Sequence, residues 1–182
     1  MKARLLRGRL LRALLLAGMF AAVSRFSSQR RNYTFEREQL VPGPRDRVFA
    51  FFADPCNLSE ITPPWIRFQV KHLEQLPLAG GTMQEYTIHW FRLPLRWESL
   101  IAEFDGGRAF TDVQTRGPYR YWRHEHTFED AGEESTLVRD RVQYALPFGI
   151  LGAIVHELVV RRQLRDIFDY RARAIEDTFR AG

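Results

Sequence analysis

The feature that most restricts the fold of this sequence is a change in the spacing of its apolar residues near Pro147. Before that point, six runs alternate as strands do and are separated by turn-forming residues about every 10 to 13 positions. The runs cover residues 66–73, 82–91, 95–104, 109–116, 119–128 and 136–146. After Pro147 and Gly149, apolar residues recur about every 3.6 positions. The sequence therefore predicts an antiparallel meander followed by one long helix.

The predicted helix has a single apolar face, and its charged residues, Arg171 among them, lie mostly off that face. The face comprises Leu151, Ile154, Val155, Leu158, Ile167, Phe168, Ala172, Ile175 and Phe179. An antiparallel sheet must curl around such a helix to bury this face. We expect that arrangement to leave a cavity between the sheet and the helix.

Ahead of the meander, residues 33–40 predict a strand and residues 45–53 a helix with a broad apolar face. Asn57 followed by Glu60 is typical of an N-cap and predicts a second short helix, which Pro63 and Pro64 end. The predicted fold class is α+β. A curved antiparallel sheet wraps around a long C-terminal helix, and two short helices follow the first strand.

Charge is divided unevenly along the chain. The sequence has 182 residues, with 27 Lys and Arg against 22 Asp and Glu. The first 35 positions hold eight basic and no acidic residues, so the rest carries 19 basic and 22 acidic residues and a net charge of −3. A nucleic-acid-binding domain needs a basic face on the folded body. We therefore expect one domain, residues 33–182, with no nucleic-acid partner.

Residues 1–32 are predicted to be a basic leader in which residues 13–23 are apolar. Eleven apolar residues are too few for a membrane-spanning helix, which needs about 20. Three interpretations stay open: a signal peptide, an organellar transit peptide and a plain N-terminal extension. The compartment is therefore not determined, and membrane association is a hypothesis for this segment alone.

Several segments also resemble a known family. They are 33–37 (YTFER), 48–54 (VFAFFAD), 57–58 (NL), 61–65 (ITPPW), 93–97 (LPLRW), 117–119 (GPY) with Trp122, His124 and His126, and 140–142 (DRV) with 144–147 (YALP). They resemble the START-like, or Bet v 1-like, helix-grip superfamily, and within it the bacterial SRPBCC branch associated with polyketide cyclases, dehydrases and lipid transport. The resemblance covers roughly residues 33–180. It implies a pocket for a hydrophobic ligand with residues 63–65 near its mouth, but no single reaction.

The last two predicted strands carry the polar residues most suggestive of chemistry. Alternation puts Trp122, His124 and His126 on one face of a strand, and Asp140 and Tyr144 on one face of the next. A buried His–carboxylate pair can act as a general base, while Tyr144 or Tyr86 holds a carbonyl group. Ligand recognition and a structural pair that satisfies its own hydrogen bonds are the alternatives.

The partner of His124 depends on the register of this hairpin. A turn at residues 130–133 with Phe128 opposite Thr136 places His124 opposite Asp140. A slip of two residues would keep the faces and change the partners.

A metal site is a further hypothesis, because His124 and His126 point the same way and need only a third ligand. Glu129 follows closely, but its spacing does not fit and no second motif follows. Cys56 is the only cysteine, which excludes a disulfide framework and a Cys-rich zinc site. We therefore predict no metal and no cofactor. The remaining histidines, His72, His89 and His156, are interpreted as ordinary surface or core residues.

Aromatic residues at strand spacing predict the wall of a pocket, although such residues more often form plain core. Asp112 and Gln114 attract attention because they are polar on a face that also carries Phe110. The candidate ligand-binding residues are Trp65, Tyr86, Trp90, Trp97, Phe110, Asp112, Gln114, Trp122, His124, His126 and Tyr144.

The favoured function is the binding or carriage of a small hydrophobic molecule, lipid-, polyketide- or isoprenoid-like. An alternative is an aromatase/cyclase or dehydratase that uses His124 and Asp140 as catalytic residues. An interaction module with a filled core is a third. We lean toward binding because the sequence has no nucleophile motif. The ligand and the oligomeric state are not determined.

Overall fold

The computed structural model describes residues 31–90 and 92–180, so nearly all of the predicted leader lies outside the described residues. Within them, one seven-stranded antiparallel sheet has the order β1-β7-β6-β5-β4-β3-β2. The strands are β1 (Tyr33–Pro42), β2 (Gln69–Leu73), β3 (Met83–Trp90), β4 (Leu93–Asp105), β5 (Ala109–Arg116), β6 (Tyr121–Asp130) and β7 (Ser135–Ala145). β2 to β7 follow one another across the sheet, and β1 pairs with β7. The predicted meander is confirmed.

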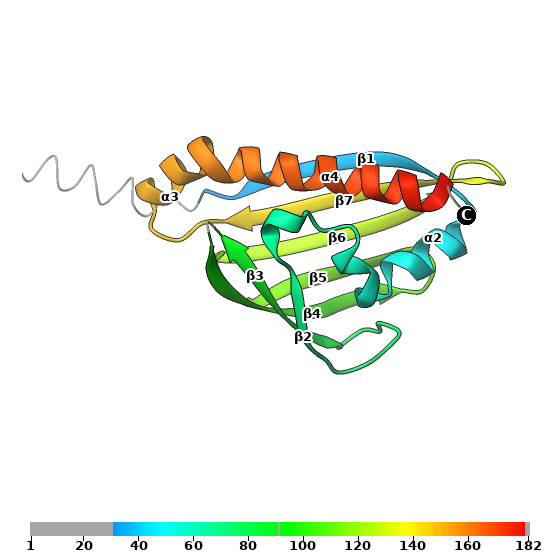
Figure 1. Cartoon of the computed structure of the whole chain (residues 1–182), viewed down its shortest axis with the longest axis horizontal. Helices are drawn as coiled ribbons and strands as arrows, with labels where there is room; N and C mark the ends of the chain where they lie inside the picture. Colours follow the sequence, from blue (N-terminus) through cyan, green and yellow to red (C-terminus); the bar gives the residue numbers. More distant parts are fainter. Residues whose placement is uncertain (1–30, 91, 181–182) are drawn as a thin grey trace, which may run out of the picture.

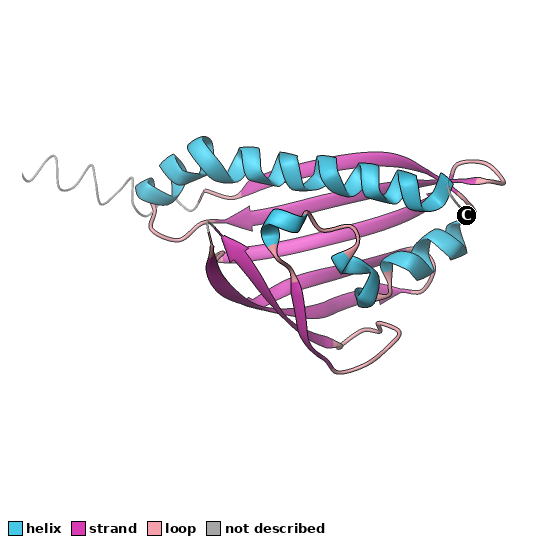
Figure 2. Cartoon of the chain, viewed as in Figure 1, coloured by secondary structure: helices cyan, strands magenta, loops and turns pink. Residues whose placement is uncertain are grey.

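Helices gather over one side of this sheet (Figures 1 and 2). α2 (Arg45–Phe52) and two short 3-10 helices, η1 (Pro55–Ser59) and η2 (Pro64–Ile66), follow β1. α3 (Ile150–Val155), the π-helical turn η3 (His156–Val160) and α4 (Arg161–Arg180) form a continuous C-terminal helix. Figure 1 shows this helix running along β1 and β7. The sheet and the long helix form the helix-grip arrangement that the sequence predicted.

The short helix after α2 begins earlier than predicted. Asp54 caps η1, because its carboxylate accepts a hydrogen bond from the backbone N–H two residues on, at 2.9 Å. Asn57 instead donates its side-chain amide to the carbonyl oxygen of Phe51 at 3.0 Å. The predicted cap at Asn57 with Glu60 is therefore wrong. Pro55 explains the earlier start, since its fixed φ angle suits the first position of a helix.

The C-terminal helix does not keep one apolar face along its length. Phe168, Ile175 and Phe179 of α4 are buried as predicted. The four apolar residues predicted to be buried earlier in the helix are exposed: Leu151 by 67%, Ile154 by 49%, Val155 by 37% and Leu158 by 73%. A π-helical turn rotates the preceding turns relative to those after it, and here His156 and Val160 are buried instead. No helix among the described residues is both long and apolar enough to cross a bilayer.

The register of the β6–β7 hairpin differs from the prediction by two residues. Phe128 lies opposite Val138, and Asp130 lies opposite Thr136. β6 extends through Asp130 and β7 begins at Ser135, so the turn lies one residue further along the chain than expected, which changes every pairing by two positions. Because the side-chain period of a strand is two, the predicted faces are kept while every partner changes.

Two apolar clusters stand at the ends of the helical layer. One joins α2 to the end of α4 and the sheet through Phe49, Phe52, Ile175 and Phe179. The other joins the start of α4 to β6 and β7 around Trp122, Val142, Tyr144, Leu164 and Phe168.

Candidate functional site

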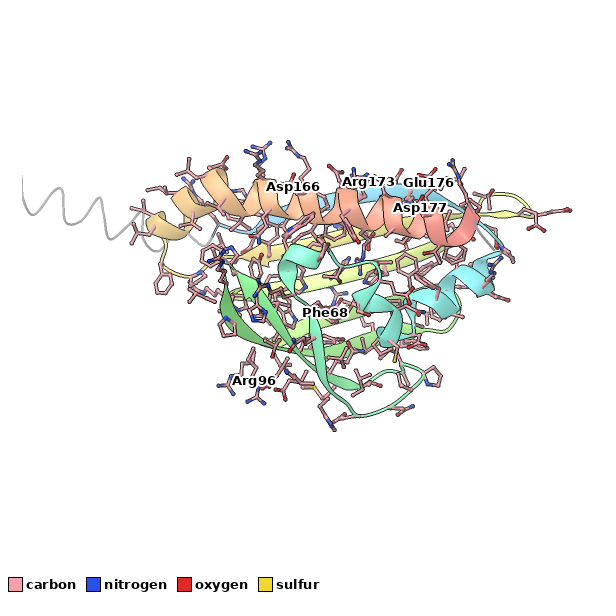
Figure 3. The ribbon with its side chains drawn as sticks, in the orientation of Figure 1. Phe68, Arg96, Asp166, Arg173, Glu176 and Asp177 are labelled. Atoms are coloured by element: carbon pink, nitrogen blue, oxygen red, sulfur yellow. The ribbon has the colours of Figure 1, made fainter. Side chains whose placement is uncertain are left out.

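A cavity of about 910 Å³ lies between the sheet and the C-terminal helix. Strands β3 to β6 form one wall, and Leu164, Ile167 and Phe168 of α4 contribute to the other. Phe68, in the connection between η2 and β2, closes part of the wall and contacts Tyr86 with ring centroids 4.8 Å apart (Figure 3). Apolar and aromatic side chains dominate the lining. Small-molecule pockets range from about 300 to 1,000 Å³, so this cavity has the size of a ligand site.

Most of the predicted pocket residues line this cavity. They are Tyr86, Trp90, Trp97, Phe110, Asp112, Trp122, His124 and His126. Strand alternation explains the agreement, since it decides which side chains face the helix. Arg96, next to Trp97 on β4, points away from the cavity and pairs with Glu85 and Glu98 on the other face (Figure 3).

Three predicted residues do not line the cavity. Trp65 in η2 is 53% exposed and packs edge-on against Tyr170. Gln114 holds the connection before β6, because its side chain hydrogen-bonds both the carbonyl oxygen and the N–H of Tyr119, at 2.7 and 3.3 Å. Tyr144 is buried outside the cavity lining, where its hydroxyl group contacts His156.

Sequence reasoning missed other lining residues. Strand alternation over the predicted run 119–128 puts Tyr119 on the face opposite Trp122, but Tyr119 precedes the first residue of β6 and lines the cavity. Arg171 was expected off the apolar face of the helix. It lines the cavity with a side chain only 12% exposed, and its Nη1 lies 3.9 Å from Oδ1 of Asp140. A charged side chain among the other charged residues of this helix gives no pattern signal that would reveal this position.

Two histidines and two aspartates form a buried cluster at one wall of the cavity. Nε2 of His124 lies 2.8 Å from Oδ1 of Asp140 in a hydrogen bond. The two residues contact each other diagonally, because His126, not His124, is directly opposite Asp140 on β7. The predicted pair therefore forms, although the predicted register does not. Nδ1 of His126 also lies 2.8 Å from Oδ1 of Asp140, but it has no well-formed hydrogen bond among the described residues.

Asp112 completes the cluster from β5, where it lies opposite His124. Its Oδ2 lies 3.5 Å from Nδ1 of His124 and 3.7 Å from Nε2 of His126. Its Oδ1 accepts a hydrogen bond from the hydroxyl group of Ser99 at 3.0 Å. The side chain of Asp112 is 19% exposed, whereas those of His124, His126 and Asp140 are 5 to 8% exposed.

Burial is the largest influence on the charges of this cluster, and it disfavours the charged form of each member. Burial lowers the pKa of His124, and the neighbouring His126 lowers it further. Burial alone would raise the pKa of Asp140, but interactions with His124 and His126 outweigh it and hold that pKa well below its ordinary value. Asp112 has a lowered pKa for the same reason. Burial would likewise lower the pKa of His126, but the two carboxylates outweigh it and raise that pKa.

A second polar pair lies on β3. Both Gln84 and Tyr86 are buried and line the cavity, and the Tyr86 hydroxyl group donates a hydrogen bond to Oε1 of Gln84. Nε2 of Gln84 is buried without a hydrogen-bond partner in the described part of the chain. The cavity thus contains an unused donor at this wall.

One end of the cavity is bordered by exposed apolar residues. Phe148, Leu151 and Val155 contribute to its lining and are exposed by 82%, 67% and 37%. This rim lies on α3 and on the connection from β7 that precedes it.

Residues 41–168 match the family described as polyketide cyclase / dehydrase and lipid transport. The chain belongs to this family. Its helix-grip fold and its place in the SRPBCC, or Bet v 1-like, superfamily are as the sequence indicated. No curated protein gives a significant match.

Solved structures share the fold at low sequence identity. A Thermus thermophilus protein, TTHA0849, is 20% identical with a TM-score of 0.62, covering 82% of this chain and 98% of its own. Zhui aromatase/cyclase from a Streptomyces species is 18% identical with a TM-score of 0.59, covering 84% and 99%. A Thalictrum flavum norcoclaurine synthase mutant is 14% identical with a TM-score of 0.61, covering 82% and 98%. At this level of sequence identity these structures support the fold and do not show the function of this chain.

Proposed function

We propose that this protein binds a small, mostly hydrophobic molecule in the cavity between its sheet and C-terminal helix, and carries or presents it. The observation that supports this most is the cavity itself, about 910 Å³ in volume and lined mainly by aromatic and aliphatic side chains. Protein interiors are ordinarily packed without voids of this size. The family description names polyketide cyclisation, dehydration and lipid transport, which agrees with a hydrophobic ligand.

The polar groups of the wall suggest the kind of ligand. The His–Asp cluster, Ser99, Arg171 and the amide of Gln84 are polar groups with little exposure in a lining that is mainly apolar. Pockets of this composition use a few polar groups to orient an apolar molecule. We therefore infer a lipid-, polyketide- or isoprenoid-like ligand that carries at least one oxygen atom.

The exposed rim favours carriage. Phe148 and Leu151 are large, apolar and mostly exposed, and both border the cavity. Exposed apolar patches next to a binding groove commonly mark sites of interaction. An apolar ligand that enters the cavity at this rim would move directly from the exposed apolar side chains to the apolar lining.

The cavity can be tested by filling it. Ile167 is a partly buried residue of α4 that lines the cavity, so Ile167→Trp should occupy part of the space. The fluorescent probe 8-anilinonaphthalene-1-sulfonate should bind the wild-type chain and bind this variant at least tenfold more weakly. Leu158→Trp is the matched control, because Leu158 is 73% exposed and does not line the cavity. Equal binding to all three proteins would contradict a binding cavity.

A second candidate function is catalysis by proton transfer. The supporting observation is the buried 2.8 Å hydrogen bond between His124 and Asp140 at the cavity wall. An aromatase/cyclase or dehydratase would use His124 as the base that takes a proton from the bound ligand. With a candidate substrate, His124→Ala should then abolish turnover while affinity survives. Turnover that persists in this variant would remove the catalytic role of His124.

A further inference from the structure

We propose that Asp112, His124 and His126 form a binding site for one divalent transition-metal ion, such as Zn²⁺, at the wall of the cavity. One donor atom from each of the three residues lies within 4.8 Å of the others. Two histidines and a carboxylate are a ligand set that zinc accepts in proteins. The proposal goes beyond the hydrophobic ligand and rests on the proposed function only in that the cavity gives access to the ion.

The two separations between Asp112 and the histidine nitrogens are close to those between ligands of one metal ion. Oδ2 of Asp112 lies 3.5 Å from Nδ1 of His124 and 3.7 Å from Nε2 of His126. Ordinary hydrogen bonds between such atoms are shorter, about 2.7 to 3.2 Å. Two ligands of a tetrahedral zinc ion with bonds near 2.1 Å lie about 3.4 Å apart. An ion could therefore bind among these atoms with little movement.

Asp140 lies beside both histidines and forms a hydrogen bond with one of them, His124. Its Oδ1 lies 2.8 Å from Nε2 of His124 and 2.8 Å from Nδ1 of His126, the ring nitrogens that the ion would not use. Metal-bound histidines almost always donate their other N–H group to a carboxylate, a backbone carbonyl or water, which fixes the tautomer and the ring orientation. Ser99 has a similar role for Asp112, because it binds Oδ1 and leaves Oδ2 facing the histidines.

The third ligand, Asp112, comes from the neighbouring strand β5, so the spacing of residues along β6 does not reveal it. Glu129, the acidic residue nearest to His126 in the direction of the turn, pairs with Arg139, and its side chain is 57% exposed. Asp112 precedes His124 by twelve positions and lies opposite it because β5 pairs with β6. The pairing of these two strands therefore creates the ligand set.

Three protein ligands leave at least one position on the ion open. All three residues line the cavity, so the open position would face the bound molecule. An ion there would bind an oxygen atom of the ligand, such as a carbonyl, hydroxyl or carboxylate oxygen, and polarise it. In this arrangement His124 binds the ion and is not available as a general base.

Metal binding can be tested without knowledge of the hydrophobic ligand. The full chain, stripped with a chelator, would be titrated with Zn²⁺ by calorimetry and with Co²⁺ by visible absorption. We expect one ion per chain and an intense Co²⁺ spectrum that Zn²⁺ abolishes. Asp112→Asn should weaken binding at least tenfold, and Asp140→Asn by about 10- to 100-fold. His72→Ala, which removes an exposed histidine on β2, is the matched control and should bind as the wild type does.

Failure of the wild-type chain to bind an ion, or equal binding by Asp112→Asn, would overturn the proposal. The Co²⁺ spectrum of the wild-type chain tests for the metal site even where a variant fails to fold. A parallel titration of the stripped protein with 8-anilinonaphthalene-1-sulfonate reports on the cavity alone, so a missing metal site and a missing ligand cavity give different results.

Discussion

The hydroxyl oxygen of Tyr144 lies 2.9 Å from Nε2 of His156, and both residues are buried. This hydrogen bond joins β7 to the π-helical turn η3. The ring of Tyr33 on β1 stacks on His156 with centroids 3.5 Å apart. Nδ1 of His156 lies 3.1 Å from the carboxylate of Glu157. His156 therefore holds the π-helical turn, at which the C-terminal helix rotates, against the sheet.

Replacing Tyr144 tests this attachment. Tyr144→Phe leaves a buried nitrogen of His156 without its partner, so the free energy of unfolding should fall by about 1–3 kcal/mol. Urea denaturation gives the value. Tyr121→Phe on the exposed side of β6 is the control and should change it by less than about 0.5 kcal/mol. Equal stability of the Tyr144 variant and the wild type would contradict the attachment.

Removing one partner of the buried Tyr86–Gln84 pair on β3 should cost more stability than removing both partners. Tyr86→Phe alone leaves Oε1 of Gln84 unpaired and should cost about 1–3 kcal/mol of the free energy of unfolding. The double variant Tyr86→Phe with Gln84→Met replaces both partners, and should recover most of that loss because it also removes the unpartnered Nε2 of Gln84. A double-mutant cycle by denaturation measures the coupling. Additive losses would show that the two side chains do not interact.

A glycine of α3 should tolerate no side chain. A Cβ atom at Gly152 would lie 2.2 Å from the carbonyl oxygen of Pro147, a backbone atom that cannot move aside cheaply. Gly152→Ala should therefore lower the free energy of unfolding by about 2 kcal/mol or more. Gly80→Ala is the matched control, since its nearest neighbour would be 3.7 Å away. Comparable stability of the two variants would contradict the close approach of α3 to the connection that follows β7.

Stability should fall at alkaline pH because of buried tyrosines. Burial, with a smaller effect of Tyr144, raises the pKa of Tyr119, and burial raises the pKa of Tyr144 to about 12. The unfolded chain loses these protons near pH 10, before the folded chain does. The stabilisation is therefore complete below about pH 9 and is lost as the pH rises through the folded-state values. Tyr119→Phe should make the decline between pH 9 and 11 shallower in urea denaturation. An unchanged slope would argue against burial of this hydroxyl group.

Periodicity predicted the parts of the structure in which a local pattern decides the outcome. The face that Trp122, His124 and His126 share follows from the two-residue repeat of a strand. The buried positions of Phe168, Ile175 and Phe179 follow from the 3.6-residue repeat of a helix. The fold class was predictable because turns and strands alternate regularly before the change of period.

Features that depend on tertiary contacts were not predictable. The length of the turn after Asp130 sets the register of β6 and β7, and two residues either way preserve the pattern. The π-helical turn at His156 leaves no trace in apolar spacing, so Leu158 was placed on the wrong side. Arg171 reaches Asp140, and Asp112 reaches the histidines, only because α4 and β5 pack against the part of the sheet that carries the cluster. Whether the predicted pocket residues hold a ligand stays a prediction.

The most direct test of the cavity is native mass spectrometry of the full chain, as purified and after incubation with a sixteen-carbon fatty acid, compared with the mass under denaturing conditions. The account predicts one added molecule per chain that is lost on denaturation. A bare chain in both native samples would contradict the central claim that this domain binds a small hydrophobic molecule.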